Sequence, residues 1–432
     1  MGFGFLVLYL VLILIRPQDW YEPLRGFHLV EPVAILTILT TFITQRPGQP
    51  LGQILSRDKY VRFMWGFLAA IVLSEVTKLH LSGTKDAVED FGKVAILFFL
   101  VLVTLDDPRP LRRMMWVMLI CTAFLCINGI MQLQTGEGIG GMRPVVWEGE
   151  AVRVKGPGIF DDPNDFASLF TMTMPFALCL LQLRGNFFSK AFMLAMAPTI
   201  LYVLYNTHSR GGLVGFCAMT LAYVWLTGRS SLPRLVMASI ILAAVVAFAP
   251  GRATSSYIEG SAGGRVEEWG IGNRLLKQFP LLGAGYQKFP YYSNWRAAHS
   301  SFVTCYAELG MIGYVFWFGL SWVVMKSLLR LARLRNQIGV TLSKFSAALF
   351  SALVGFHVTG FFLTRTYNHL LFILLGMGVG IIRYASRLPE VPQGYLDVSP
   401  RDIRQTIAFA VLSVPVIWIL ARLYWRAAGA GA

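Results

Sequence analysis

Charged residues are scarce in this chain. They make up 14% of its 432 residues, whereas hydrophobic residues make up 55%. A soluble globular domain carries about 25% charged residues, so the composition excludes a soluble protein of this size. Apolar runs recur from the first residue to the last, and no separate soluble domain is visible. We therefore predict an all-α, polytopic membrane protein whose residues 1–432 form a single integral membrane domain.

Cysteine is also scarce, and no two cysteines have CxxC spacing. The five cysteines all fall within or at the edge of apolar segments, at Cys121, Cys126, Cys179, Cys217 and Cys305. This distribution favours neither a disulfide framework nor a zinc site. We expect ordinary packing cysteines.

The sequence lacks a basic, aromatic-rich soluble face, which argues against nucleic-acid binding, and it lacks internal repeats, which argues against a transporter. The net charge of +15 comes from basic residues dispersed over short connectors. Nucleic-acid binding would instead need basic residues interleaved with aromatics on one soluble face. No period of 20 to 50 residues repeats, and no inverted pair of broken apolar segments is visible, which disfavours a transporter without excluding it.

Apolar windows long enough to cross a bilayer predict about twelve or thirteen membrane helices. The first window lacks a basic leader and a cleavage site, so we expect a retained span. The last contains Pro415 and could span, lie in the interface, or be an appendage to a twelve-helix core. The windows are 2–15, 29–45, 61–77, 88–104, 114–134, 166–183, 190–207, 211–227, 234–250, 303–325, 345–364, 367–386 and 406–421.

Lysine and arginine cluster in alternate connectors, which predicts that these connectors and the N-terminus are cytoplasmic. The remaining connectors, including residues 135–165 and 251–298, mix Asp and Glu with Arg. We expect these two large loops to face outward and to form the active region.

One polar motif, "YNTHSRGGLVGF", lies between two apolar runs. Arg210 precedes Gly211 and Gly212, which predicts a sharp break and a new helix at the outer membrane boundary. Arg210 could simply extend to water at that boundary. It could also bind an anion, because guanidinium is always charged and grips phosphate bidentately. We expect His208 only to cap the helix or face water.

A second motif, "KGPGIFDDPNDFASLF", enters the predicted span at 166–183. Asp162 or Asn164 is suited to cap the following helix. Alternatively, Asp161, Asp162 or Asp165 could hold a divalent cation on a diphosphate, since carboxylate oxygens are the ligands that such cations prefer.

The third motif covers most of the second outward loop and enters the next span. Arg265 and Trp269 lie one helical turn apart in a predicted amphipathic helix at the membrane surface. His299 lies where the following span begins, and Gly310 and Gly313 permit close packing against a neighbour. A boundary histidine is often an ordinary interfacial residue. Beside two outward arginines it becomes a candidate base at an anion site.

Taken in order, these motifs resemble the O-antigen ligase and O-antigen polymerase superfamily of bacterial envelopes. In that family a His followed by Asn, Ser or Gln precedes a Gly-x-x-Gly, and His299, Ser300, Gly310 and Gly313 fit this pattern. The resemblance covers roughly residues 150–325. The matching segments are "GIFDDPNDFA", "HSRGG", "GRVEEW…FPLLGAGYQKF" and "HSSFVTCYAELGMIGY".

The resemblance implies a lipid-carrier (GT-C type) glycosyltransferase without a cofactor. Such an enzyme moves a glycan from a polyprenyl-diphosphate donor to an acceptor hydroxyl at the periplasmic face of the bacterial inner membrane. Arg210 and Arg265 would bind the diphosphate, and His299 would activate the acceptor. The other predicted substrate-binding residues are Arg274, Asn164 and Ser300. Members are generally considered metal-independent. A single displacement with a base and no nucleophile would invert the anomeric centre. The acid-rich "DDPND" departs from the family pattern, so a metal-binding role for its carboxylates stays open.

Several functions stay open at this stage. The acceptor could be a lipid A core sugar, the terminus of a growing polymer, as in a Wzy-type polymerase, or a protein side chain. A transporter or flippase of a lipid-linked glycan would use the same arginines without a reaction. A structural partner in a polysaccharide assembly complex would need none of them.

Overall fold

The computed structural model describes residues 2–44, 51–146, 151–228 and 255–427. Within these ranges the chain is helical apart from turns and one isolated antiparallel bridge between Val145 and Arg153. The α-helices are α1 (Gly2–Ile15), α2 (Pro17–Trp20), α3 (Val30–Ile43), α4 (Leu51–Arg57), α5 (Lys59–Val76), α6 (Leu81–Thr104), α7 (Pro108–Thr135), α8 (Pro163–Gln182), α9 (Phe187–Asn206), α10 (Arg210–Thr227), α12 (Ser255–Gln278), α13 (Phe289–Tyr292), α14 (Ser301–Arg333), α15 (Arg335–Ile338), α16 (Val340–Gly360), α17 (His369–Ala385) and α18 (Pro400–Ala427). The short 3-10 helices are η1 (Glu22–Leu24), η2 (Ile139–Gly141) and η3 (Gly158–Phe160).

The all-α, polytopic fold is confirmed. Every predicted window in the described residues coincides with a helix, and the window at 234–250 lies outside them. Seven helical segments of the described part are long and apolar enough to cross a membrane. They are Gly2–Trp20, Pro108–Thr135, Pro163–Gln182, Phe187–Asn206, Ser301–Arg333, Val340–Gly360 and Pro400–Leu420.

These seven are fewer than the twelve or thirteen spans predicted. The remaining helices fall short for different reasons. α3 and α17 are apolar but shorter. α6 opens with a charged stretch between Lys85 and Lys93, and α10 opens with Arg210 and two glycines.

The five cysteines are buried and free, as the sequence indicates.

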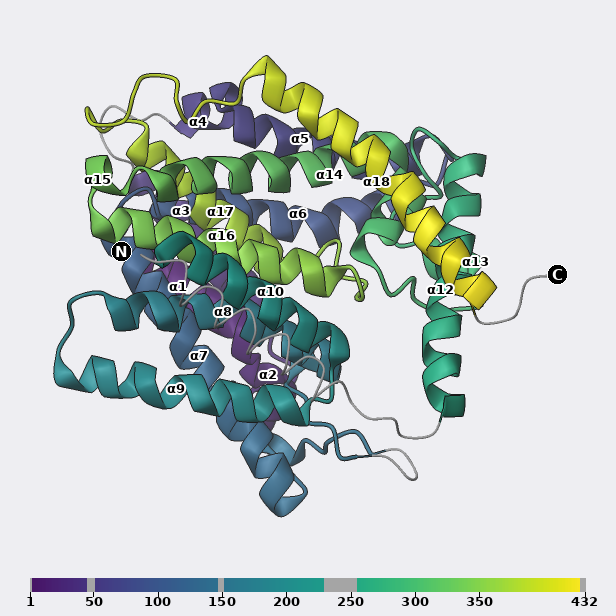
Figure 1. The fold of residues 1–432 in the computed structure, drawn as a ribbon, viewed down its shortest axis with the longest axis horizontal. Coiled ribbons are helices and arrows are strands. Elements are labelled where there is room, and N and C mark those ends of the chain that lie inside the picture. Colours follow the sequence, from purple (N-terminus) through teal and green to yellow (C-terminus); the bar gives the residue numbers. More distant parts are fainter. Residues whose placement is uncertain (1, 45–50, 147–150, 229–254, 428–432) are drawn as a thin grey trace.

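The centre of the molecule is a tight group of helices around α16, which contacts α8, α10, α14 and α17. Gly215 of α10 faces α16 so closely that a Cβ atom there would collide with the Thr359 side chain. Small residues that let helix backbones approach closely are typical of packing between membrane helices. This packing brings the beginning of α10 and the end of α16 to the same region, because the two helices run antiparallel in the bundle (Figure 1).

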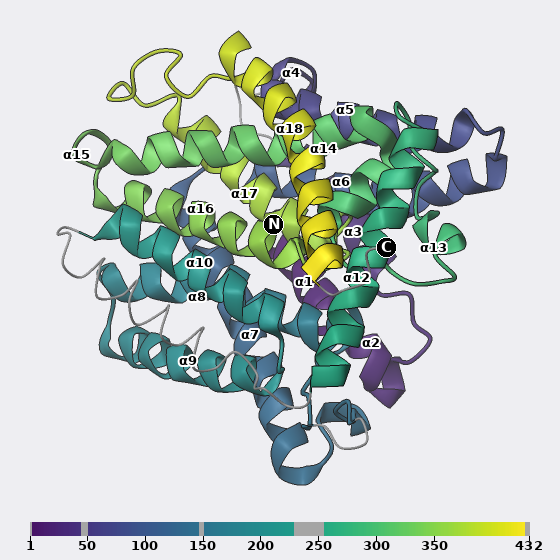
Figure 2. The ribbon, with the colours of Figure 1, turned by 45° about the vertical axis from the view of Figure 1, so that its right-hand side comes forward.

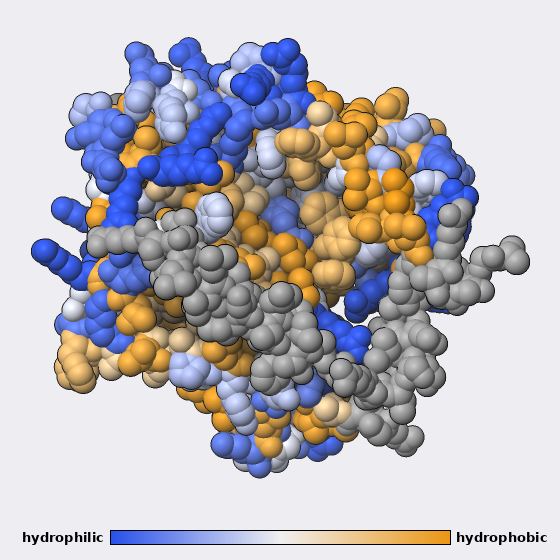
Figure 3. Space-filling view, in the orientation of Figure 1, coloured by the Kyte–Doolittle hydropathy of each residue, from blue (hydrophilic) through white to orange (hydrophobic). Residues whose placement is uncertain are grey.

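The connectors predicted to be cytoplasmic and the larger predicted outward loop lie at different ends of the molecule. α4, α15 and the connector between α17 and α18 lie at one end in Figure 1, whereas α12 and α13 lie at the other. In Figure 3 hydrophilic residues gather over the end that carries α4 and α15.

Apolar side chains, among them Ile407, Leu412 and Val416, are exposed along α18.

α12 runs across the end of the bundle where α14 begins, as Figures 1 and 2 show from two directions. It packs on α14 and α18. The predicted amphipathic helix around Arg265 therefore exists. Its Val266 and Trp269 are buried against the bundle, whereas Glu267 is exposed.

α14 breaks at Gly310, whose backbone adopts φ 64 and ψ −170. The turn at 280–285 enters this break, where the Met311 N–H donates to the Pro280 carbonyl at 2.9 Å. A Cβ atom at 310 would collide with the backbone of Leu281. The sequence predicts that Gly310 packs against a neighbour, and that neighbour is this turn rather than another helix. Glycine is needed there for both its φ and the close approach.

Candidate functional site

The structure brings together Arg210, Arg265 and His299, which come from three separate segments. Arg210 is the first residue of α10, whose N-cap is Ser209, with the Ser209 hydroxyl accepting from the Gly212 N–H at 3.1 Å. The predicted capping role of His208 therefore belongs to Ser209. Arg265 lies on α12, close enough to Arg210 for their charges to interact, and its charge acts on His299 in turn.

His299 is held at a strained bend just before α14. Its φ is +47, a value that few residues other than glycine adopt. The indole of Trp269 donates to the carbonyl of the preceding Ala298 at 3.1 Å. The ring of Phe361 packs edge-on against Trp269 with centroids 5.2 Å apart. These contacts hold the bend against α12, and strain of this kind is often found at functional sites.

The surroundings of His299 favour the neutral imidazole. Burial lowers the pKa of His299 from its ordinary value, and the charge of Arg265 lowers it further. The Asp162 carboxylate acts in the opposite direction. Burial is the largest of these three effects. A neutral ring can accept a proton, as a general base must.

Arg265 lies in a region rich in positive charge. Burial lowers its pKa, Glu268 raises it, and Arg210 and Arg153 lower it. Glu268, one helical turn after Arg265, is only 4% exposed. Burial raises the pKa of this carboxyl to about 7, although Arg296 and Arg265 act in the opposite direction. Near neutral pH Glu268 therefore compensates the arginine charges only in part, and a bound anion would be stabilised here.

The three carboxylates of "DDPND" make three separate interactions. Asp161 pairs with Lys155 at 2.7 Å. Asp162 is the N-cap of α8 and accepts from the Asn164 N–H at 2.7 Å. Asp165, which is 2% exposed, forms a bidentate pair with Arg365. In the described part of the chain, no group of three or more His, Cys, Asp or Glu is placed to hold a metal ion.

Two of the other predicted substrate-binding residues have local structural contacts. The Asn164 side chain accepts from Arg153 at 3.2 Å. Arg153 also donates to the carbonyl of Thr207 at 3.0 Å, which ties the first outward loop to the start of α10. Ser300 is fully buried and caps α14 by accepting from the Val303 N–H.

Arg274 is the predicted residue that the structure leaves apart from the others. It is exposed on α12, about 13 Å along the helix from Arg265 by the rise per residue. It is not among the charges that act on Arg265 or His299.

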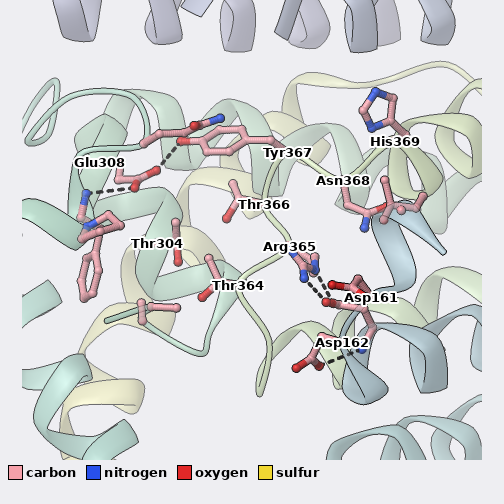
Figure 4. A pocket seen from close by; sticks show the side chains of 18 residues that line it. Asp161, Asp162, Thr304, Glu308, Thr364, Arg365, Thr366, Tyr367, Asn368 and His369 are labelled. Atoms are coloured by element: carbon pink, nitrogen blue, oxygen red, sulfur yellow. Dashed lines mark hydrogen bonds and ion pairs between the residues drawn. The ribbon is translucent and has the colours of Figure 1, made fainter. Parts of the chain in front are cut away.

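A cavity of about 630 Å³ adjoins this group. It is lined by η3, the start of α8, α13, the beginning of α14 and the connector between α16 and α17. Figure 4 shows Arg365 on one side and Glu308 with Tyr367 on another. Arg210 and Arg265 do not line it, whereas Asp162 and Ala298 do. His299 does not line it either, but the preceding residue, Ala298, does.

Comparison with protein families gives one match, to the family described as O-antigen ligase, over residues 192–318. The match confirms the resemblance seen in the motifs and supports a glycosyltransferase of the O-antigen ligase and polymerase type. Comparison of the chain with curated proteins gives no match.

The matched segment includes Arg210, Arg265 and His299 but not every residue around them. Asp162, Asp165 and Arg153 precede it, and Arg365 follows it. Sequence reasoning missed Arg365, although its signal matched that of Arg210, since both are arginines in a short connector between apolar runs. It also missed Glu268, whose spacing of one helical turn from Arg265 was the available signal.

Proposed function

We propose that this protein transfers a glycan from a polyprenyl-diphosphate carrier to an acceptor hydroxyl. The observation that carries the proposal is that Arg210 and His299 both lie within electrostatic reach of Arg265, close to a cavity that Ala298 lines. The family match supports the reaction type. We place the reaction at the periplasmic face of the bacterial inner membrane, because the mixed-charge loops that carry this site are predicted to face outward.

The reaction needs only a charge stabiliser and a base. The acceptor oxygen attacks the anomeric carbon, and the bond from that carbon to the diphosphate oxygen breaks with its electron pair on the diphosphate. Arg210 and Arg265 stabilise the departing charge with planar, bidentate donors. His299 takes the hydroxyl proton. The products are the glycosylated acceptor and polyprenyl diphosphate, and a single displacement inverts the anomeric centre.

The family match does not separate a ligase from a polysaccharide polymerase, and a protein acceptor is a further alternative. We favour a ligase that uses a lipid A core sugar or a similar acceptor. A transporter of the same donor would bind it at the arginines and release it unchanged. The placement of a neutral histidine beside the arginines favours the enzyme.

The test is reconstitution of the purified protein in liposomes with a polyprenyl-diphosphate glycan and a set of acceptors. We expect transferred glycan and an equal amount of released polyprenyl diphosphate. Donor binding followed by movement across the bilayer, without release of the diphosphate lipid, would contradict the enzyme and support the transporter.

The predicted orientation has its own test. Single cysteines placed in 279–298 and in 326–344, in a background without the native cysteines, would be treated with an impermeant reagent in intact spheroplasts. We expect labelling only in 279–298. Labelling in 326–344 instead would place the site on the other side of the membrane.

A further inference from the structure

The cavity beside His299 has no role in the reaction as described so far. Glu308 lines one part of it and accepts a hydrogen bond from the Tyr367 hydroxyl at 2.8 Å and one from the Phe289 N–H at 3.1 Å. Arg365, which lies on another side in Figure 4, pairs with Asp165, and both residues line the cavity. Its volume of about 630 Å³ lies within the usual range for small-molecule sites.

The lining offers hydroxyl and amide groups. Thr304, Thr364 and Thr366 lie between Glu308 and Arg365 in Figure 4. The hydroxyls of Thr304 and Thr366 donate to backbone carbonyls, both at 2.8 Å. The hydroxyl oxygen of Thr364 is buried and has no hydrogen-bond partner among the described residues. A buried polar group without a partner is costly, so Thr364 marks a place where a ligand can supply the missing bond.

Acidic side chains outnumber basic ones in the lining, which does not favour an anion. Asp161, Asp162, Asp165 and Glu308 line the cavity, and Arg365 is the one lysine or arginine among the described lining residues. Arg365 is itself engaged by Asp165. A diphosphate is therefore disfavoured in the cavity and favoured at Arg210 and Arg265 outside it. Carboxylates and threonine hydroxyls instead accept hydrogen bonds from a neutral ligand with many hydroxyl groups.

We propose that this cavity holds the terminal sugar of the acceptor, with its reacting hydroxyl at the edge formed by Ala298, next to His299. The assignment rests on the proposed function. It places the acceptor sugar on the cavity side of His299 and the diphosphate on the arginine side. The base then lies between the two substrates, as proton transfer during attack requires.

The first test removes one hydroxyl. Thr364→Val keeps the shape of the side chain and loses a group that no described residue uses. The probe is a fluorescent lipid A–core glycolipid that lacks O-antigen, titrated onto the purified protein without donor. We expect the Kd to rise about two- to tenfold, the range of a single hydrogen bond. The matched control is Thr173→Val, a buried threonine of α8 whose hydroxyl bonds within its own helix.

The second test fills the cavity. Ala297 lines it and is half-buried, so Ala297→Leu adds volume where the sugar would lie. We expect acceptor binding to weaken about tenfold or more, with the binding of a polyprenyl-diphosphate disaccharide unchanged. Ala195→Leu, on the exposed face of α9, is the control for the added bulk.

The outcomes separate the two proposals. Unchanged acceptor binding in both variants, or weakened donor binding in place of weakened acceptor binding, would overturn the cavity assignment. If wild-type protein binds donor and acceptor but transfers nothing, the proposed reaction fails, while the effects of Thr364→Val and Ala297→Leu on acceptor binding would still support the cavity as a sugar site.

Discussion

Arg265 and Arg365 are both half-buried arginines near the same cavity, but they have different surroundings. Arg365 forms a bidentate pair with Asp165, which is nearly inaccessible. Arg265 has Arg210 and Arg153 among its neighbours, and its adjacent acid, Glu268, has a pKa raised to about 7 by burial. The charge of Arg365 is compensated by the Asp165 carboxylate. The charge of Arg265 lies in a region with excess positive charge.

The difference shows that the position of an arginine at a membrane boundary is not enough to assign its role. A buried arginine needs compensation, and the source of that compensation decides whether it stabilises the fold or binds a ligand. We infer that Arg365 connects the α16–α17 connector to α8, whereas Arg265 and Arg210 meet the diphosphate of the donor.

The largest expected effect concerns the base in the Arg265 region. His299→Ala should lower the single-turnover rate of transfer about a hundred- to ten-thousand-fold, the usual contribution of general-base catalysis. Donor binding should change little, because the arginines remain. Single-turnover transfer and donor binding would be measured on the same preparation. Weak donor binding with a normal rate for the bound fraction would mean that His299 binds substrate and is not the base.

The next effect concerns the Arg365 region and is one of stability. Asp165→Asn and Arg365→Gln should each lower the stability of the folded protein, because each leaves a charge without its partner. The Arg365 side chain is 39% exposed, so solvent screening reduces the coupling to about 1–2 kcal/mol. A double-mutant cycle on unfolding in detergent would measure it. Additive effects of the two substitutions would show that the pair contributes nothing to stability.

The smallest expected effect is a shift in pH dependence. The Asp162 carboxylate raises the pKa of His299, so Asp162→Asn should lower that pKa further. The base is active when neutral, and the rise of the rate with pH should therefore move to lower pH, by less than about one unit. Asparagine caps helices as well as aspartate, so α8 should persist. The profile of rate against pH would be compared with that of Asp161→Asn, and a shift to higher pH would contradict the assignment.

Much of the fold follows from the sequence because apolar windows are a strong signal for membrane helices. Each predicted window in the described residues is a helix. The break at Gly310 was not foreseen, because it depends on the turn at 280–285 entering α14. Contacts between segments that are distant along the chain leave little trace in a single sequence.

Arg210 and His299 are visible as candidates in the sequence because each is a polar residue that interrupts an apolar pattern, and their role stays a prediction. The role of Arg365 was not predictable, since its partner Asp165 lies 200 positions away in sequence. The predicted set also included Arg274, which lies on α12 like Arg265 but well away from the cluster. The sequence places both arginines in one predicted loop, but it does not show on which face of α12 each side chain lies.

The central claim is that Arg265 binds the donor's diphosphate and Arg365 does not. Its most direct test is the affinity of a labelled polyprenyl diphosphate, without glycan, for Arg265→Lys and Arg365→Lys in liposomes. Lysine keeps the charge but loses the planar donor pair. We predict that Arg265→Lys weakens binding about tenfold or more, whereas Arg365→Lys binds as wild type does and unfolds at a lower temperature. Equal loss of affinity in both variants, or a loss confined to Arg365→Lys, would contradict the account.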